Sequence, residues 1–538
     1  MDEKIIKLMD KKYNQQSKEE NLLNIKFQDE IKIQVLKQFE LAGLSYKQLQ
    51  KIQKQLPIIY PWNKRYQLLR NNYNRRFTYF PMGIIRCKNT KDVQESVLFV
   101  NKYNLEFSLR SGAHCYLAFS LSTGIIIDLF EMDQIEIVHN AESCKSETTI
   151  RNDKHVILGP GARLGVVIQH LSPYKLSLPV GSCPNTCIAG LSLGGGISPS
   201  LIRLSGLMCD HIIGAEMVLA NGKIINVNKN HHSDLYFAIR GAGASNFGVV
   251  TKLIFNPCKF KGAIVFNIQY PFSTFRQVVT MWQNFAPFTD CRLSTELDVT
   301  PPQFTSNNEL PVQFKGQFEG SMKELLFLID DFIHLAQNSQ TVYIKGVKTF
   351  AQAGQFWSLT AQTYFENNSI FWQNKLSSDA LDVYATFLEN APSLGSSIEF
   401  NAMLGAVEDI KSNETAFPYR KSLFWVQHRG TTLNPQDLPA QQLWVNALYD
   451  AISPFAEKVA NNIVPAYVNA PQANLQVDNK FLTAYYGTNV QRLIEIKNRY
   501  DPTNFFHFDQ SIPTSVHGVL SNSNVQDQIL SCVPNFCY

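Results

Sequence analysis

The spacing of apolar residues divides the chain into stretches with different patterns. Over residues 1–75, residues such as Ile31 and Leu36 recur among Lys, Gln, Asn and Glu, which predicts a helical, peripheral extension. Beyond it, short Val, Ile and Leu runs such as residues 124–129 are separated by Gly, Pro and Asn. Strand patterns that alternate with helical ones predict a domain of the α+β class over residues 76–257.

Longer amphipathic segments begin after residue 257. Residues 258–475 hold five of the six tryptophans, and the apolar spacing over residues 322–337 predicts a helix. We interpret this stretch as a second domain of sheet and helices. A last structured segment, residues 476–513, precedes a polar tail at residues 514–538.

The composition indicates a large, mostly buried protein and excludes several classes of function. Charged residues make up 17% of the 538 residues, against a typical fraction of about 25%, and the length suits at least two packed units. A net charge of +4 is too small over this length for charge-driven binding of nucleic acid. No apolar stretch approaches the ~20 residues that cross a bilayer, so we expect no membrane span. The charged N-terminus lacks the apolar core of a secretory signal, so we expect a cytoplasmic protein.

The ten cysteines are scattered along the chain, which indicates free, buried thiols and not a disulfide framework. Cys183 and Cys187 are four positions apart, but no second pair lies near them to complete a zinc site, so we expect no metal. Cys532 and Cys537 in the tail have a spacing that permits a small disulfide or none.

Glycine gathers at three places where the backbone turns tightly or approaches a ligand. The first is residues 110–114, Arg-Ser-Gly-Ala-His, directly after the alternating pattern of residues 105–109, so it should be a loop at the end of a strand. Successive backbone N–H groups in such a turn, with an arginine beside them, form a nest suited to a pyrophosphate. The alternative is a surface turn with a solvated arginine.

The other two glycine-rich segments follow later in the same domain. Residues 181–196 carry five glycines, and their entropic cost indicates a backbone packed against a flat or anionic ligand. The triple glycine in this segment does not fit the G-x-G-x-x-G pattern of a nicotinamide-binding fold. Residues 240–248 run into the β-like segment 249–255, whereas a phosphate-binding P-loop enters a helix.

Taken together and in this order, these segments resemble the berberine bridge enzyme-like FAD-linked oxidases of the vanillyl-alcohol oxidase superfamily, whose cofactor domain is of the p-cresol methylhydroxylase (PCMH) type. No single segment is specific, but their joint order is. The middle domain matches only in its general pattern. Further segments that carry the resemblance are Asn74-Arg75-Arg76-Phe77, Gly159-Pro160-Gly161-Ala162, Tyr467-Val468-Asn469, Tyr485-Tyr486-Gly487-Thr488-Asn489, Asp501-Pro502-Thr503-Asn504 and Gln510-Ser511-Ile512-Pro513.

The resemblance implies a PCMH-type FAD-binding domain over residues 76–257, completed by residues 476–513, and an inserted substrate domain of antiparallel sheet covered by helices. It also implies bicovalent FAD, with His114 bonded to the 8α methyl group of the flavin and Cys183 to ring position 6. The further cofactor-binding residues that it implies are Arg110, Ser111, Gly112, Ala113, Ser120, Gly181, Ser182, Thr186, Gly190, Val250, Asn469, Tyr486 and Asn489.

The resemblance assigns the chemistry to few residues. Tyr467 matches the tyrosine that faces the substrate beneath the flavin, which implies a catalytic base. An ordinary phenol has a pKa near ~10, so a neighbouring positive charge or the flavin must lower it. Thr186 stands where oxidases of the family often have valine and where relatives that react poorly with dioxygen have bulkier residues.

The implied function is an oxidase that removes a hydride from an alcohol or a related carbon of a small molecule. Dioxygen is then the electron acceptor, and hydrogen peroxide is the product. Two alternatives stay open: an FAD-dependent dehydrogenase with another acceptor, and a flavin-bearing scaffold without turnover. The sequence does not identify the substrate or the oligomeric state.

Overall fold

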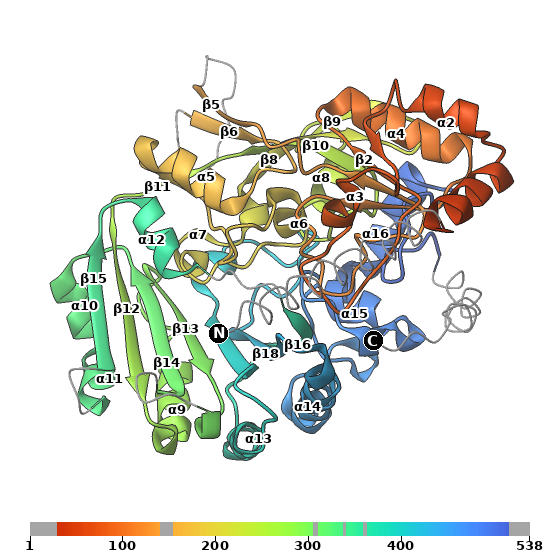
Figure 1. The fold of residues 1–538 in the computed structure, drawn as a ribbon. Coiled ribbons are helices and arrows are strands. Elements are labelled where there is room, and N and C mark those ends of the chain that lie inside the picture. The colour runs from red at the N-terminus through yellow and green to blue at the C-terminus, as the bar shows by residue number, and fades with distance from the viewer. Residues whose placement is uncertain (1–29, 140–153, 305–309, 337–340, 359–362, 516–538) are drawn as a thin grey trace, which may run out of the picture.

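A computed structural model describes residues 30–139, 154–304, 310–336, 341–358 and 363–515. Figure 1 shows two bodies, an upper one built around two smaller sheets and a lower one built on a long-stranded sheet. The C-terminal helices return to the upper body.

The first sheet of the upper body is partly parallel. Strands β2, β4 and β3 run parallel, β1 pairs antiparallel with β2, and the order is β1-β2-β4-β3. All four residues of β2 and of β4 are buried, as expected for strands that are covered on both faces. Asn89 caps the covering helix α4 by accepting a hydrogen bond from the backbone N–H of Asp92. The elements are β1 (Ile58–Ile59), β2 (Gly83–Arg86), α4 (Thr90–Lys102), β3 (Phe107–Arg110) and β4 (Ile125–Asp128).

The second sheet of the upper body is antiparallel, in the order β5-β6-β10-β8-β9. The predicted β-like segment 249–255 is confirmed as its central strand, β10. Short helices and a two-stranded pairing of β7 with β11 surround this sheet. The elements are β5 (Ile135–His139), β6 (Lys154–Leu158), α5 (Leu164–Leu171), β7 (Leu176–Ser177), α6 (Ile188–Leu193), α7 (Ile202–Ser205), β8 (Ile212–Val218), β9 (Ile224–Asn228), α8 (Ser233–Ala238), β10 (Val249–Phe255) and β11 (Cys258–Lys259).

The described part of the N-terminal stretch is helical, as the pattern predicts, but it is not only peripheral. This stretch contains a helix at residues 30–41, then α2 (Tyr46–Ile52) and α3 (Tyr66–Leu69). The strand β1 lies between α2 and α3 in the sequence and extends the first sheet. Phe39 and Leu49 are buried in the same apolar cluster as Ile85 of β2. Residues 30–75 therefore contribute to the core of the first domain.

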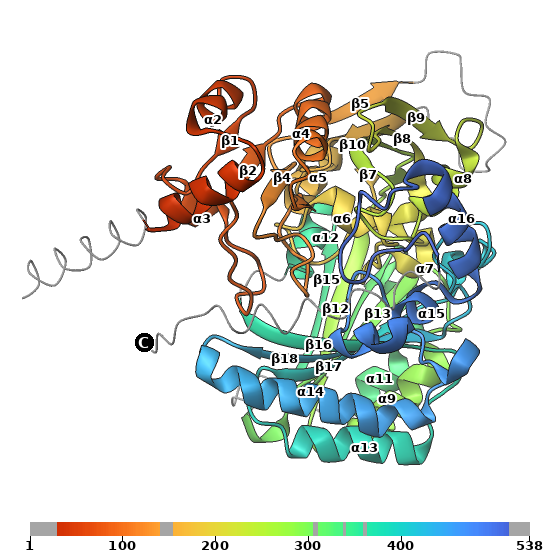
Figure 2. The same cartoon turned by 90° about the vertical axis from the view of Figure 1, so that its right-hand side faces the viewer.

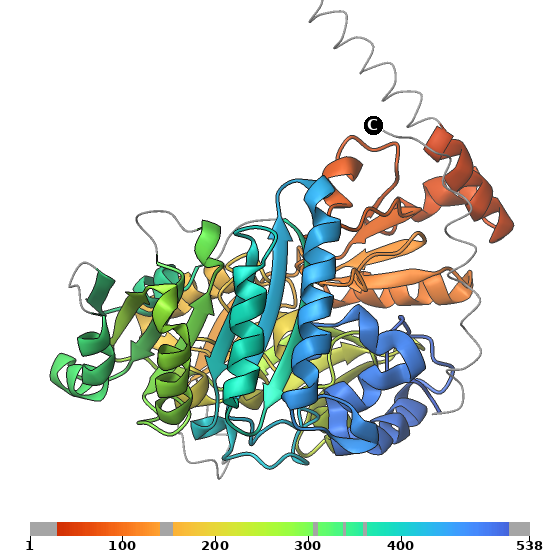
Figure 3. The same ribbon diagram turned by 90° about the horizontal axis from the view of Figure 1, so that it is seen from below.

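The lower body is a seven-stranded antiparallel sheet, in the order β15-β12-β14-β13-β17-β18-β16. Helices cover its outer face, and the upper body faces the other (Figure 2, Figure 3). Alternate residues of each strand point to the helices, because side chains of a strand alternate between the two faces. The strands are β12 (Ala263–Tyr270), β13 (Leu293–Val299), β14 (Val312–Phe318), β15 (Val342–Val347), β16 (Tyr364–Trp372), β17 (Ser396–Ala402) and β18 (Phe424–Thr432).

The helices of this body bury an apolar cluster that is separate from the clusters of the upper body. The helix predicted over residues 322–337 is interrupted: Ile329, with φ −107° and ψ 16°, separates two shorter helices. Residue 337 lies outside the described residues. These helices are α9 (Phe275–Phe285), α10 (Met322–Leu328), α11 (Asp330–Leu335), α13 (Ser378–Glu389) and α14 (Leu438–Ile452). In contrast, α12 (Phe350–Phe356) buries Phe350 and Ala353 in the cluster of the upper body.

The closing segment packs against the upper body. Tyr486 of α15 (Lys480–Tyr486) and Leu493 of α16 (Val490–Tyr500) are buried in the same cluster as Leu164 of α5. This is the arrangement that the α+β, PCMH-type prediction requires. None of the helices in the described part of the chain is long and apolar enough to cross a bilayer. Cys532 and Cys537, whose spacing permits a small disulfide or none, lie outside the described residues.

Candidate active site

A cavity of about 360 Å³ lies between the glycine-rich loops of the upper body and the inner face of the sheet. Its walls come from segments that are far apart in the sequence but meet in the fold. The upper wall is made by Tyr73, residues 111–116, Phe119, Ser120, residues 181–183, Thr186, Cys187, Gly190, residues 243–246 and residues 467–471. The sheet wall is made by Phe365, Asn367, Glu399, Asn401, Trp425, Gln427, Arg429 and Thr431.

His114 and Cys183 line the same cavity, and Tyr73 contacts both of them. The Tyr73 ring stacks on the His114 imidazole with 4.1 Å between ring centroids, and its hydroxyl hydrogen-bonds with the Cys183 thiol. Burial lowers the pKa of His114 to about 4, so the imidazole is neutral at physiological pH. Its Nδ1 lies 3.2 Å from Oγ1 of Thr186. Burial raises the pKa of Cys183, which therefore stays a thiol.

The loop after β3 has no room for larger residues. A Cβ atom on Gly112 would lie 2.7 Å from the backbone nitrogen of Cys187, a contact that real Cβ atoms essentially never make. Backbone N–H groups of residues 117–120 surround the buried thiol of Cys115 and oppose the rise in its pKa that burial causes, and the nest predicted at residues 110–114 stays a prediction. The hydroxyl oxygen of Ser120 is buried at the cavity wall and has no hydrogen-bond partner among the described residues.

Tyr467 lies where the glycine-rich segment 181–196 meets the sheet. Its hydroxyl oxygen accepts hydrogen bonds from the backbone N–H of Gly196 at 2.8 Å and of Ile197 at 3.3 Å, and from the Asn469 amide at 3.0 Å. A Cβ atom on Gly194 would overlap this amide. Burial raises the pKa of Tyr467, and the three donors act against that rise. Three N–H groups around one phenol oxygen favour its ionised form.

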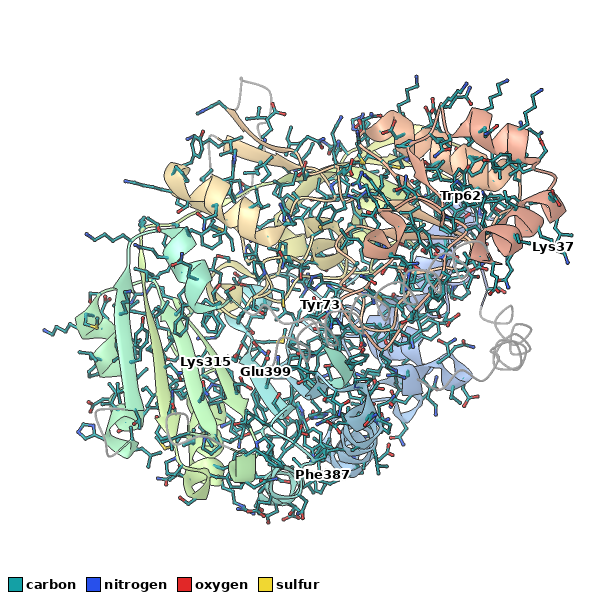
Figure 4. The ribbon with its side chains drawn as sticks, in the orientation of Figure 1. Lys37, Trp62, Tyr73, Lys315, Phe387 and Glu399 are labelled. Carbon is teal, nitrogen blue, oxygen red and sulfur yellow. The ribbon has the colours of Figure 1, made fainter. Side chains whose placement is uncertain are left out.

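The sheet wall carries a row of charged side chains. Arg429 pairs with Glu399 at 2.9 Å, and its guanidinium also lies 3.5 Å from Asp298. Lys315 continues the row by pairing with Asp298 at 3.2 Å and with Glu296 at 3.6 Å. Figure 4 shows Glu399 and Lys315 on the sheet and Tyr73 on the upper body. Burial, together with the negative charge of Glu399, raises the pKa of Glu296 to about 8.

Because Glu296 keeps its proton at neutral pH, this row carries two carboxylates and two cations. Its net charge is then zero. The polar groups of the sheet wall include the paired Arg429 and Glu399, the Asn401 amide that donates to Glu399 at 2.7 Å, and the Gln427 amide that donates to Asn367. Trp425 stands beside them, with its ring 5.4 Å from that of Tyr467. The sheet wall is therefore polar but close to neutral.

Most of the predicted site residues meet at this cavity, but four do not. The Arg110 side chain is buried and pairs with Asp128, because Arg110 is the last residue of β3 and is not part of the loop. Val250 belongs to β10 and packs in the core. The Tyr486 hydroxyl donates to the Ala242 carbonyl, and the Asn489 amide donates to backbone carbonyls at residues 412–416. These four side chains lie outside the cavity lining and hold the fold around it, and their predicted cofactor contacts stay predictions.

Several cavity residues were missed by the sequence analysis. Cys115, Tyr116 and Tyr485 lie inside or beside segments that carry the resemblance, but the resemblance assigned cofactor binding to their neighbours in the sequence. On the sheet, a signal existed in the alternation of β18. Every second residue of this strand reaches the cavity, namely Trp425, Gln427, Arg429 and Thr431.

Cys183 and Cys187 line the same cavity, but the thiol of Cys187 contacts the Gly161 carbonyl at 3.1 Å. Within the described ranges, no three His, Cys, Asp or Glu side chains gather in a way that could hold a metal ion.

Comparison with known proteins places this fold in a family. Residues 81–228 match the family described as "FAD binding domain", and residues 466–513 match the one described as "Berberine and berberine like". The chain is 31% identical over 457 residues to the uncharacterized FAD-linked oxidoreductase YgaK of Bacillus subtilis, covering 83% of this chain and 94% of that protein. The chain belongs to the berberine bridge enzyme-like FAD-linked oxidoreductases.

Solved structures of the berberine bridge enzyme-like fold resemble the whole molecule. BBE-like 1 of Physcomitrella patens superposes with a TM-score of 0.75 at 24% identity, over 85% of this chain and 97% of that one. A chitooligosaccharide oxidase superposes with a TM-score of 0.72 at 23% identity, over 86% and 98%. Both show that the fold is shared over about 85% of this chain.

The residues present at the cavity fit the FAD that defines this family of oxidoreductases. An anion such as the diphosphate needs hydrogen-bond donors, and the unpartnered Ser120 hydroxyl at the cavity wall supplies one. A flat ring needs a wall without bulky side chains, and Gly181 and Gly190 leave the backbone open to the cavity.

Proposed function

We propose that this FAD-linked oxidoreductase is an oxidase with bicovalent FAD, bonded through His114 and Cys183. Its substrate is a small molecule that loses a hydride from an alcohol or related carbon, and dioxygen accepts the electrons to give hydrogen peroxide. The observation that carries the proposal is that an imidazole and a thiol 69 positions apart in the sequence line one cavity with Tyr467 and share Tyr73 as a neighbour.

The protonation states and the contacts of His114 and Cys183 support covalent attachment. A neutral imidazole keeps a free lone pair for bonding to carbon, and the pKa of about 4 keeps His114 neutral. The Thr186 hydroxyl beside Nδ1 and the Tyr73 ring stacked on the imidazole restrict how it can rotate. The thiol of Cys183 is held by the Tyr73 hydroxyl. When bound, FAD supplies a ring that takes up a hydride and passes two electrons to an acceptor.

Tyr467 is the group that removes the proton of the substrate hydroxyl. Its three N–H donors oppose the effect of burial, but burial outweighs them and the pKa of Tyr467 is raised, so the bound flavin has to supply the lowering that a base needs. Asn469 holds the phenol in position, because its amide also donates to the Leu191 carbonyl at 2.8 Å. Proton transfer by a positioned side chain contributes about 10²–10⁴ to a rate.

Dioxygen as the acceptor is supported by Thr186 and by one structural relative. The Thr186 side chain is about as large as valine and stands beside His114 at the cavity wall. A protein of the same fold is named a chitooligosaccharide oxidase. A small residue at this position leaves space for dioxygen next to the flavin.

The linkage is tested by the spectrum of acid-precipitated protein. The wild type and the single variants His114→Ala and Cys183→Ala should keep yellow flavin in the pellet, because each single variant retains one bond. The double variant should release its flavin into the supernatant. Cys187→Ala is the matched control, since it removes another thiol of the same cavity and should change nothing. Release of all flavin from the wild type would refute bicovalent attachment.

The acceptor is tested separately. After anaerobic reduction by a substrate found in a screen of alcohols, mixing with air should restore the oxidised spectrum rapidly and release peroxide in equal amount. Slow reoxidation in air would favour a dehydrogenase with another acceptor. A Thr186→Val variant, with the same shape and no hydroxyl, should reoxidise at least as fast as the wild type.

A further inference from the structure

A buried histidine outside the cavity has a fixed positive charge. His211 is 9% exposed, its Nδ1 lies 2.8 Å from the backbone oxygen of Asn256, and its Nε2 lies 2.8 Å from the backbone oxygen of Ser205. A carbonyl oxygen only accepts hydrogen bonds, so both ring nitrogens must donate. Only the imidazolium carries two N–H groups. The geometry therefore requires the cationic form of His211.

This buried cation lies next to a thiol. A buried charge needs a partner, and Asp210, the preceding residue, is already bound by both terminal nitrogens of Arg420 at 2.7 Å. Sγ of Cys258 lies 3.9 Å from His211 Nδ1 and 3.5 Å from Ser205 Oγ. Cys258 begins β11, and its side chain is partly exposed. A thiol beside an imidazolium is stabilised as the thiolate, which is the nucleophilic form.

We propose that Cys258 is a reactive thiolate held by the His211 imidazolium, and that this pair is a site of oxidation by hydrogen peroxide. The sulfur attacks one peroxide oxygen, so that an S–O bond forms as the O–O bond breaks. The sulfur loses two electrons and becomes a sulfenic acid, while the other peroxide oxygen leaves as hydroxide, which the buffered solvent protonates to water. The reaction needs peroxide and no other partner.

The charges around the pair support a thiolate at neutral pH. Burial raises the pKa of Cys258, but the His211 charge and the hydrogen bonds with His211 and Ser205 outweigh it, so the net shift is downward. Burial lowers the pKa of His211, but Cys258 and the two carbonyls raise it to about 9. Glu319 opposes ionisation of Cys258, and its own pKa is raised to about 7 by burial against the pull of Lys261. Below about pH 7, Glu319 becomes neutral and no longer opposes the ionisation of Cys258.

The site is separate from the proposed oxidase chemistry. Neither Cys258 nor His211 lines the cavity, so changes there leave His114 and Tyr467 in place. Peroxide released by the proposed oxidase would be one source of oxidant. The test adds peroxide directly, so its outcome does not depend on turnover. Other thiols differ: burial raises the pKa of Cys87 and of Cys187 to about 12.

The experiment uses full-length protein pulsed with iodoacetamide between about pH 5 and 9, with each cysteine followed by peptide mass spectrometry. Cys291, which is exposed, is the accessible reference thiol. At about pH 6, Cys258 should react at least about tenfold faster than Cys291, because each unit of lower pKa gives tenfold more thiolate. His211→Gln should abolish this advantage. His334→Gln, which removes an exposed histidine, should preserve it.

A Cys258 that reacts no faster than Cys291 at any pH, or does not react, overturns the proposal. This comparison needs only the wild type, so it holds even where His211→Gln fails to fold. In a second arm, protein is exposed to hydrogen peroxide and then to dimedone, which traps sulfenic acids. An adduct at Cys258 and none at Cys291 is the expected result. Fast alkylation without a dimedone adduct would overturn the oxidation step.

Discussion

The two walls of the cavity are built in different ways. The upper wall is made of short continuous segments in which backbone atoms make many of the contacts. Examples are the loop around Gly112 and the N–H groups of residues 117–120 beside Cys115. The sheet wall is made of side chains from β16, β17 and β18. A site made of backbone leaves a contiguous motif in the sequence, whereas a site made on a sheet leaves only every second residue of several strands.

The electrostatics of the two walls differ as well. The upper wall holds groups that burial keeps uncharged, a neutral imidazole at His114 and a thiol at Cys183. The sheet wall holds ionised groups that neutralise one another, led by the pair of Glu399 and Arg429. This contrast fits a site in which the upper wall holds the cofactor and the sheet wall contacts the substrate.

The largest effect is expected where the two walls meet. Tyr467→Phe should lower the rate of flavin reduction by a responsive substrate by about 10²–10⁴, since the proton acceptor is lost. Anaerobic stopped-flow absorbance measures this rate. Tyr419→Phe is the control, because the Tyr419 hydroxyl donates to the carbonyls of Thr483 and Ala484 and does not line the cavity. Equal rates in Tyr467→Phe and the wild type would show that Tyr467 is not the base.

A smaller effect is expected from the backbone of the upper wall. Gly112→Ala should lower the free energy of unfolding by about 1–3 kcal/mol, because its Cβ would strike the Cys187 backbone. The FAD content per protein should fall with it. Gly346→Ala is the control, since a Cβ atom on Gly346 of β15 would have open space and Gly346 does not line the cavity. Thermal unfolding measures the change in stability, and the ratio of flavin to protein absorbance measures the FAD content. Equal losses in the two variants would contradict a backbone-defined wall.

The smallest effect concerns the charges of the sheet wall. The pKa of Glu296 is about 8, whereas an unfolded glutamate has a pKa near ~4.3. Between about pH 5 and 8, the folded protein therefore holds a proton that the unfolded chain has released, so this group reduces stability as pH rises. Glu296→Gln mimics the neutral acid and should remove that component, a slope on the order of 1 kcal/mol for each pH unit.

The free energy of unfolding, measured with urea at about pH 5 and about pH 8, gives this pH dependence. Glu414→Gln, which alters an exposed carboxylate, should leave the pH dependence as it is in the wild type. The same pH dependence in Glu296→Gln and the wild type would mean that Glu296 is ionised in the folded protein.

Individual elements show where prediction from sequence succeeded and where it stopped. The run at residues 249–255 is β10 because its apolar, β-branched residues suit a buried strand. The helix expected over residues 322–337 breaks at Ile329, although the apolar periodicity continues through it. Arg110 was placed in a loop, but it ends β3 and pairs with Asp128, a partner 18 positions away that no local pattern specifies.

The sequence by itself determined the family, the FAD cofactor and most of the segments that line the upper wall of the cavity, because a backbone that must turn tightly against a ligand requires glycine at particular positions in one continuous stretch. The tertiary structure decided what surrounds Tyr467, which side chains of the sheet face the cavity, and that His211 lies against Cys258. Those facts depend on which strands and loops become neighbours. Contacts between residues distant in the chain, and the burial that sets their charges, exist only once the chain has folded.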